Sequence, residues 1–365
     1  MRKLIGDFFK ENAKVEVVGT ARNGKDALKK IQMLKPDVIT MDVEMPEMNG
    51  LEALKQIMAE CPVPVVMLSS TTQRNAENTL LAMEYGAVDF VAKPSGTISL
   101  DLHKIQDELI YKVEQAAVVS VDKLKKTLAV NHTAASTFQK IAPVKPSLTR
   151  PQPVERKQEA PVFVNKTRTE WSKTSKKIIV LGTSTGGPRA LQEVITKLPA
   201  NIQAPILVVQ HMPAGFTKSL ATRLDQLSNV TVKEAEQGDI LHNGVVYIAP
   251  GGFHMKLRKV GMSFGIVLDQ TEPPRSGHRP SVDVMFEDVS KFKDFDKIAV
   301  IMTGMGYDGS KGLIALKEAG NVIAIAESPD TCIVYGMPKA AVETKLVDEV
   351  TDVDEIAQSI MKYML

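Results

Sequence analysis

The sequence predicts two parallel α/β domains joined by an irregular linker. Short buried apolar runs alternate with amphipathic stretches of helical spacing, first within residues 1–95 and again from Lys176 onward. This alternation is typical of parallel sheets covered by helices, and 365 residues are enough for two domains of ordinary size. Between the two series, residues 131–174 contain five prolines and many basic side chains but no apolar period, which indicates an extended linker. The expected boundaries are 1–120 for the first domain, 121–175 for the linker and 176–365 for the second domain.

Composition and charge argue against several classes of protein. An apolar fraction of 44% and a charged fraction of 24% are ordinary for a globular protein, and a net charge of +2 gives no reason to expect nucleic acid or a membrane surface as partner. No run approaches the ~18 apolar residues of a membrane span, and the first residues are too polar for a signal peptide. The two cysteines form no disulfide framework. We therefore expect a soluble cytoplasmic protein, and a monomer because no coiled-coil heptads occur.

The alternating apolar runs and amphipathic stretches of residues 1–95 predict the order of strands and helices in the first domain. Each apolar run ends at a polar or turn residue, and each amphipathic stretch has helical spacing. A longer amphipathic stretch over 100–126 suits one or two further helices. The expected helices are 1–12, 24–34, 50–60 and 73–85, and the expected strands are 15–18, 37–41, 64–68 and 88–92.

Three of these strands end in polar residues, Asp42, Ser69 and Lys93. Ligands of open parallel sheets bind at the carboxyl ends of strands, so the three side chains should converge. A carboxylate, a hydroxyl and a lysine are the groups that aspartyl phosphorylation needs, because Asp42 would attack the phosphoryl group while the other two hold its oxygens. Any one of them alone is more simply a helix cap or a turn residue; together they favour a phospho-acceptor site.

Residues 41–50, Met-Asp-Val-Glu-Met-Pro-Glu-Met-Asn-Gly, resemble the receiver domain of two-component response regulators. The resemblance extends to Pro94 and implies a flavodoxin-like fold. It also implies Asp42 as the phosphorylation site, Ser69 as the switch hydroxyl and Lys93 as the phosphate-binding lysine.

One departure from the receiver pattern concerns its first strand. Receivers open with an apolar strand that ends in an acidic pair, which binds Mg²⁺ together with the acceptor aspartate, and neither occurs here. In the strand order 2-1-3-4-5 this strand is the central one. Two explanations are open, a start codon placed downstream of the true one, which we favour, and an impaired domain. In this form we expect Mg²⁺ binding and phosphorylation at Asp42 to be weakened, and regulation to be poor.

The second series opens with a buried run followed by Gly-Thr-Ser-Thr-Gly-Gly-Pro at residues 182–188. Gly182-x-Ser184-x-Gly186 has the spacing of a nucleophile elbow, in which a sharp strand-to-helix turn exposes a serine. On this motif alone two other interpretations stay open. One is a phosphate-binding loop, although a Walker lysine and G-x-G-x-x-G spacing are both missing, and the other is a plain tight turn. The expected strands of this domain are 178–181, 206–209, 245–248, 298–302 and 322–326.

A serine nucleophile needs a general base, and the chain has six histidines. His211 directly follows a buried strand, so it should lie at the same sheet edge as Ser184. His254 and His278 lie in loops and are less well placed. Position therefore favours His211.

The base in turn needs a carboxylate that orients it. Asp308 lies in Thr-Gly-Met-Gly-Tyr-Asp-Gly, residues 303–309, directly after the expected strand 298–302. A turn-forming Asp-Gly pair is the alternative interpretation, and Asp269 and Asp283 are weaker rivals. The resulting order Ser, His, Asp differs from the Ser, Asp, His order of α/β-hydrolases.

The second domain resembles the chemotaxis protein-glutamate methylesterase family (CheB-type) from residue 176 to about 340. The order of receiver, linker and esterase matches as well. The resemblance implies Ser184 as nucleophile, His211 as general acid and base, and Asp308 as the orienting carboxylate. It also implies an oxyanion donor at the backbone of Met305, with Thr185 close to the nucleophile. The matching segments are 182–188, 210–213, 249–251, 279–283 and 303–309.

The same resemblance implies an activity and its control. The activity is hydrolysis of glutamate γ-methyl esters on methyl-accepting chemotaxis receptors to glutamate and methanol, together with deamidation of receptor glutamines. Hydrolysis is expected to need no cofactor, whereas Mg²⁺ serves phosphorylation of the receiver by the chemotaxis histidine kinase. The unphosphorylated receiver would cover the active-site face, and phosphorylation at Asp42 would release it.

Three alternatives remain at this stage. The chain could be a general esterase or amidase under receiver control. It could instead be a response regulator whose output domain only binds, for example to DNA, although the near-neutral charge and the lack of a short helix-turn-helix unit count against that. The third alternative is a scaffold with an inactive triad, against which the intact Ser184, His211 and Asp308 argue.

Overall fold

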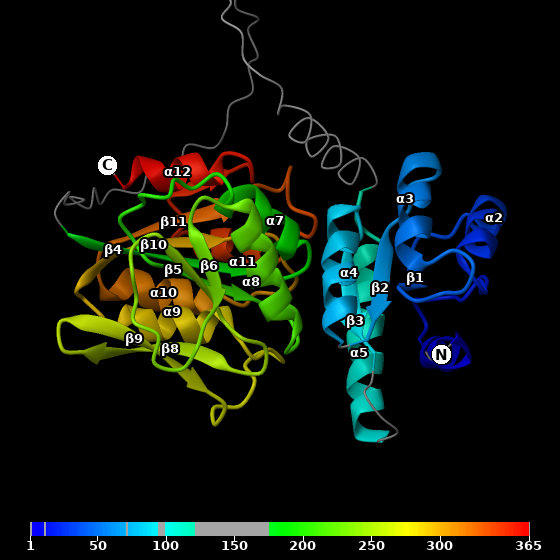
Figure 1. The fold of residues 1–365 in the computed structure, drawn as a ribbon, viewed down its shortest axis with the longest axis horizontal. Helices are drawn as coiled ribbons and strands as arrows, with labels where there is room; N and C mark the ends of the chain where they lie inside the picture. Colours follow the sequence, from blue (N-terminus) through cyan, green and yellow to red (C-terminus); the bar gives the residue numbers. More distant parts are fainter. Residues whose placement is uncertain (1, 11, 71, 94–98, 121–174, 365) are drawn as a thin grey trace, which may run out of the picture.

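The computed structural model describes residues 2–10, 12–70, 72–93, 99–120 and 175–364, with side chains from residue 105 onward in the fourth range. Within these ranges the chain forms two α/β units that pack against each other (Figure 1). No helix in the described ranges is long and apolar enough to cross a membrane. Nearly all of the expected linker lies outside the described residues.

The first unit is built on a three-stranded parallel sheet in the order β1-β2-β3. Helices α2, α3 and α4 cover one face of this sheet, and α1 and α5 cover the other. Polar residues cap the starts of helices where the sequence indicates. For example, the Asn49 side chain accepts from the N–H of Glu52 and the Glu52 side chain accepts in return, a capping box at the start of α3. The bounds are α1 Arg2–Phe9, α2 Gly24–Leu34, β1 Ile39–Asp42, α3 Gly50–Glu60, β2 Val65–Ser69, α4 Gln73–Glu84, β3 Asp89–Ala92 and α5 Ser99–Ala116.

The strand expected at 15–18 does not form, and this prediction is wrong. Residues 15–21 have no regular structure, and Val17 and Val18 are 45% and 51% exposed. A cavity of about 790 Å³ lies between this segment and β1, and its wall includes Ile31 of α2 and Val113 of α5. A strand forms by pairing with a neighbouring strand. In the receiver order the neighbour of this segment is the central strand, and the described residues supply none at that place. The flavodoxin-like fold without its first strand is otherwise confirmed.

The second unit is a seven-stranded parallel sheet in the order β12-β11-β10-β4-β5-β7-β6. Helices α7, α8 and α12 cover one face, and α9, α10 and α11 cover the other. The predicted doubly wound architecture is therefore confirmed. The bounds are β4 Lys176–Thr183, α7 Gly187–Ile195, β5 Ile206–Gln210, α8 Phe216–Leu227, β6 Thr231–Glu234, β7 Val245–Ile248, α9 Val282–Ser290, β10 Phe295–Ile301, α10 Ser310–Ala319, β11 Val322–Glu327, α11 Met337–Glu343, β12 Glu349–Thr351 and α12 Ile356–Lys362.

Four strands of this unit were not predicted from the sequence. The edge strands β6 and β12 have only four and three residues. The other two form an antiparallel hairpin, β8 His254–Val260 and β9 Ser263–Asp269, which packs against α9. In β8 charged residues alternate with Met255 and Leu257, as expected when one face is exposed, whereas β9 is mostly apolar.

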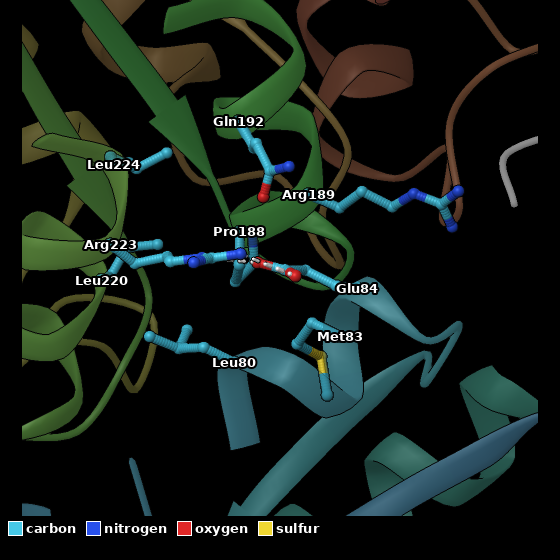
Figure 2. A pocket seen from close by; sticks show the side chains of 9 residues that line it. All are labelled: Leu80, Met83, Glu84, Pro188, Arg189, Gln192, Leu220, Arg223 and Leu224. Atoms are coloured by element: carbon cyan, nitrogen blue, oxygen red, sulfur yellow. Dashed lines mark hydrogen bonds and ion pairs between the residues drawn. The ribbon is translucent and has the colours of Figure 1, made fainter. Parts of the chain in front are cut away.

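The two units meet where α4 packs against α7 and α8 (Figure 1). Figure 2 shows this contact at close range, with Glu84 of α4 pointing toward Arg223 of α8. The guanidinium of Arg223 donates to both carboxylate oxygens of Glu84, at 2.8 and 3.1 Å. The rings of Phe90 and Phe216 lie 4.6 Å apart at the same junction. The space among these side chains amounts to only about 10 Å³.

The first prediction concerns the tight approach of Gly50 to β1. A Cβ at this position would overlap the carbonyl oxygen of Asp42, which is backbone and cannot move aside. We expect Gly50→Ala to destabilise the first unit by about 3 kcal/mol. Gly6→Ala is the matched control, because a Cβ in that helix meets nothing within 4 Å, and it should be neutral or stabilising by up to about 1 kcal/mol. Urea unfolding of both variants measures the difference; equal stabilities would contradict this packing.

Candidate active site

Ser184 lies in the turn between β4 and α7, at the carboxyl edge of the sheet. Gly186 adopts a φ of +77°, which favours glycine, and a Cβ on Gly187 would overlap the side chain of Gln210. The N–H of Ser184 donates to the carbonyl of Thr303 at 3.0 Å, so the end of β10 holds the turn in place. The side chain of Ser184 is partly exposed, as a nucleophile must be.

Gln210 joins the serine turn to the histidine. Its amide nitrogen donates to the carbonyl of Ser184 at 3.0 Å and to that of His211 at 3.1 Å, although the residue is only 2% exposed. The two backbones are therefore fixed relative to each other. This role of Gln210 was not predicted from the sequence. A buried polar residue that ends an apolar strand could have suggested it.

His211 and Asp308 form a buried pair. The imidazole Nε2 lies 2.8 Å from Oδ2 of Asp308, and the two side chains are 4% and 2% exposed. An ionised carboxylate accepts from Nε2–H, so the proton lies on Nε2 and Nδ1 is left as an acceptor. Nδ1 is buried and makes no hydrogen bond in the described part of the chain. The histidine can therefore accept a proton at Nδ1.

The N-terminus of α9 holds the carboxylate of Asp308. Its oxygens accept from the hydroxyl of Ser281 at 2.9 Å and from the N–H groups of Val282 and Asp283 at 2.7 and 2.9 Å. Burial raises the pKa of Asp308, but the hydrogen bonds from His211 and from these N–H groups outweigh it and lower the pKa to about 2. The carboxylate is thus ionised near neutral pH and fixes the orientation of the imidazole.

The rival residues take supporting positions. His278 stacks on His211, with ring centroids 3.9 Å apart and planes within 8°, and burial lowers the pKa of His278 to about 3, so it is neutral. Asp283 accepts from the N–H groups of Gly309 and Gly312 and so braces the loop that carries Asp308. The other two lie in the hairpin region, where His254 contacts the carbonyl of Pro273 and Asp269 pairs with Lys256.

The loop 303–309 passes directly beside the nucleophile. A Cβ on Gly304 would lie 2.8 Å from Cβ of Ser184, so only glycine fits there. The N–H of Met305, the next residue, makes no hydrogen bond within the described ranges. It is therefore available to bind an oxyanion close to Ser184.

The first unit covers this site. The hydroxyl of Thr185, next to the nucleophile, donates to the carboxylate of Asp89 at the start of β3. Asp89 is paired in turn with Lys112 of α5 at 3.2 Å. Met305 and Val334 of the active-site loops share one buried apolar cluster with residues of β3 and α5. These contacts place the receiver-like unit against the residues on either side of Ser184.

The structure brings Asp42 and Lys93 together in the first unit. The ammonium of Lys93 contacts Oδ1 of Asp42 at 2.6 Å, and the N–H of Glu44 donates to the same oxygen. Ser69 is fully buried and points away from Asp42, since its hydroxyl accepts from Thr79 at 2.7 Å. In this conformation the hydroxyl is not positioned to hold a phosphoryl oxygen on Asp42.

The residues around Asp42 do not fit a complete Mg²⁺ site. Asp42 is already engaged by Lys93, and the carboxylate of Glu44 accepts from the amide of Asn75. No group of three potential ligand side chains occurs within the described ranges. A hard cation that prefers octahedral oxygen ligands would find one carboxylate here.

The fold and the site define a two-domain protein in which a receiver-like unit covers a site of serine-hydrolase type. Residues 179–360 match the CheB methylesterase family, and residues 1–103 match the response regulator receiver domain. The chain therefore belongs to the CheB methylesterase family.

Relatives span both domains. The protein-glutamate methylesterase/protein-glutamine glutaminase of Geobacillus kaustophilus is 51% identical over 99% of this chain and 95% of its own. The protein of the same name from Bacillus subtilis is 49% identical over 99% of this chain and 94% of its own. The crystal structure of the Thermotoga maritima CheB methylesterase catalytic domain is 46% identical, covers 52% of this chain and 99% of its own, and superposes with a TM-score of 0.50.

The second prediction tests the pairing of His211 with Asp308. In Asp308→Asn the neutral amide no longer stabilises a protonated imidazole or fixes its tautomer, so we expect kcat for a small ester such as p-nitrophenyl acetate to fall by about 10⁴-fold. Asp269→Asn is the control, because that carboxylate pairs with Lys256 in the hairpin, and its kcat should be unchanged. A fall of less than about tenfold in Asp308→Asn would contradict the assigned geometry.

Proposed function

We propose that this chain is a protein-glutamate methylesterase that hydrolyses glutamate γ-methyl esters on methyl-accepting chemotaxis receptors. The observation that carries the proposal is the buried His211–Asp308 pair, whose free Nδ1 lies at the same sheet edge as Ser184. Family membership supplies the substrate class. Because methyl-accepting receptors would present these esters on cytoplasmic helices, we propose a cytoplasmic enzyme. The proposed domain limits are 1–120, 121–175 and 176–365.

We propose an acylation step in which the Ser184 hydroxyl comes within reach of Nδ1 of His211, to which it makes no hydrogen bond in this structure. Ser184 gives its hydroxyl proton to Nδ1 of His211, and Oγ attacks the ester carbonyl carbon. The negative charge that develops on the carbonyl oxygen is bound by the N–H of Met305. When the C–O bond breaks, the histidine returns the proton to the leaving methoxide, and methanol departs.

Deacylation repeats the sequence with water. His211 takes a proton from water, the hydroxide attacks the acyl-enzyme, and the proton returns to Oγ of Ser184 as glutamate leaves. With a glutamine substrate the same steps release ammonia instead of methanol, so one site supports both activities. Asp308 remains ionised throughout, because its hydrogen bonds stabilise the charged form. We propose that neither activity needs a cofactor.

We also propose that the receiver inhibits the enzyme by covering the site and that phosphorylation of Asp42 by the chemotaxis histidine kinase releases it. Asp42 contacts Lys93, which directly follows β3, and the first residue of β3, Asp89, binds Thr185 beside the nucleophile. A phosphoryl group on Asp42 would redirect Lys93 and so disturb β3. We propose a monomer as the active form.

The third prediction tests the proposed activity. Methylated receptor membranes incubated with the full chain should release methanol, and Ser184→Ala should reduce the rate by at least 10³-fold because the attacking oxygen is gone. Ser263→Ala, at the exposed start of β9, should keep the full rate. Equal methanol release from Ser184→Ala and the unchanged chain would sink the proposal.

The fourth prediction tests inhibition by the receiver. Glu84→Arg places two cations at the interface in place of the bidentate pair, so docking should weaken by at least about 1 kcal/mol, and basal methanol release should rise about fivefold or more. Combining it with Arg223→Glu restores an opposite-charge pair and should lower the rate again.

The control for this charge reversal is Glu60→Arg, on the exposed end of α3 away from the interface. It adds the same charge to the receiver and should leave basal activity unchanged. If Glu60→Arg and Glu84→Arg raise activity equally, the effect comes from net charge and not from docking.

A further inference from the structure

Glu327 is a buried carboxyl group that the mechanism above does not use. It is the last residue of β11 and only 1% exposed. Its Oε2 accepts from the N–H of Thr303 at 2.7 Å, and its Oε1 accepts from the hydroxyl of Thr331 at 3.0 Å. No lysine, arginine or histidine of the described ranges pairs with it. A buried carboxyl without a cation is costly and so calls for an explanation.

Thr303 connects this carboxyl to the nucleophile. The carbonyl of Thr303 accepts from the N–H of Ser184 at 3.0 Å, and its hydroxyl donates to the carbonyl of Thr185 at 2.9 Å. The same hydroxyl accepts from the N–H of Val334 at 3.0 Å. All hydrogen-bonding groups of Thr303 are thus engaged, and its N–H is held by Glu327 alone. Glu327 therefore fixes the residue from which the loop with Met305 departs.

Opposing interactions act on the pKa of the Glu327 carboxyl group. Burial raises its pKa to about 7, against the hydrogen bonds from Thr303, Thr331 and the Cys332 thiol, which favour the ionised form. Asp352, the charged group that faces it from beyond β12, also raises the pKa. Below pH 7 the group is mostly neutral, and above pH 7 a buried negative charge forms beside the loop that binds the oxyanion.

We propose that Glu327 is a positioning residue for the ester hydrolysis, holding Thr303 and through it the Ser184 turn and the Met305 loop, and that its neutral form supports the reaction better than its ionised form. In the neutral form one oxygen still accepts from Thr303, and the carboxyl O–H donates to the Thr331 hydroxyl. In the ionised form the contact to Thr303 persists, but the buried charge opposes the negative charge that develops on the substrate oxygen. The inference rests on the proposed function.

The test compares Glu327→Gln with Glu327→Ala in the full chain. Gln keeps an acceptor for Thr303 and is uncharged at every pH. We expect kcat of the unchanged enzyme to decline as pH rises through about 7. Glu327→Gln should retain kcat at pH 6 and lose this decline. Glu327→Ala leaves the Thr303 N–H without its acceptor, so kcat should fall about 10–100-fold while KM changes little.

The measurements are kcat and KM for methanol release from methylated receptor membranes between pH 5.5 and 9. The rate at which a fluorophosphonate labels Ser184 over the same range is a second readout that needs no receptor. Asp296→Asn is the matched control, because Asp296 is a buried carboxylate at the opposite end of the same sheet, and its pH profile should follow that of the unchanged chain.

The outcomes separate this inference from the proposed function. A pH profile of Glu327→Gln that superimposes on that of the unchanged chain overturns the role of its charge, and unchanged kcat and labelling in Glu327→Ala overturn the positioning role. If Glu327→Ala does not fold, the profile of Glu327→Gln decides. Absent methanol release, with Ser184 labelling that still depends on Glu327, would refute the substrate and support the inference.

Discussion

The carboxylate of Asp308, bound at the N-terminus of α9, is the interaction on which the active site depends. Three donors from residues 281–283 and the imidazole of His211 converge on its two oxygens. This arrangement offsets the cost of burying a charge and also determines which histidine nitrogen carries the proton. It further ties three separate parts of the chain, the ends of β5 and β10 and the start of α9, into one rigid group.

The second constraint on the site is that the residues beside the nucleophile also contact the receiver. Thr185 and Met305 flank the nucleophile, and in this structure both contact the receiver, the first through Asp89 and the second through an apolar cluster. The His211–Asp308 pair is formed while the receiver is docked. In the proposed mechanism, release therefore separates two surfaces without rebuilding that pair.

Sequence patterns predicted the central strands for one physical reason, and the same reason brought the candidate residues to one sheet edge. Strands buried on both faces read as continuous apolar runs, and in parallel sheets their carboxyl ends meet, so Asp42 and His211 were proposed from strand ends, and Asp308 from the glycine-rich loop that follows β10. The edge strands and the hairpin were missed because short, half-exposed strands lack such runs. Residues 15–18 have a strand-like pattern, but pairing decides whether a strand forms, and no partner is present.

Some of the site residues that were not predicted leave a signal in the sequence, and others do not. His278 reaches His211 from a distant loop, and no spacing rule reveals a stack between two rings. Gln210 and Glu327, in contrast, each end an apolar run. His211 directly follows such a run, so the rule that located His211 applies to these two residues as well.

The cavity beside β1 reaches one of the elements that contact the catalytic unit. The cavity of about 790 Å³ and the unpaired segment lie beside β1, at one edge of the three-stranded sheet, and Val113 of α5 lines the same cavity. The contacts to the catalytic unit come from α4, β3 and α5. Asp42, which ends β1, and α5 thus border the same open space, so packing at this cavity bears on both the phosphate site and the surface that meets the catalytic unit. Helix α4 lines no part of this cavity, so its contact with α7 and α8 can open or close independently of the packing around β1.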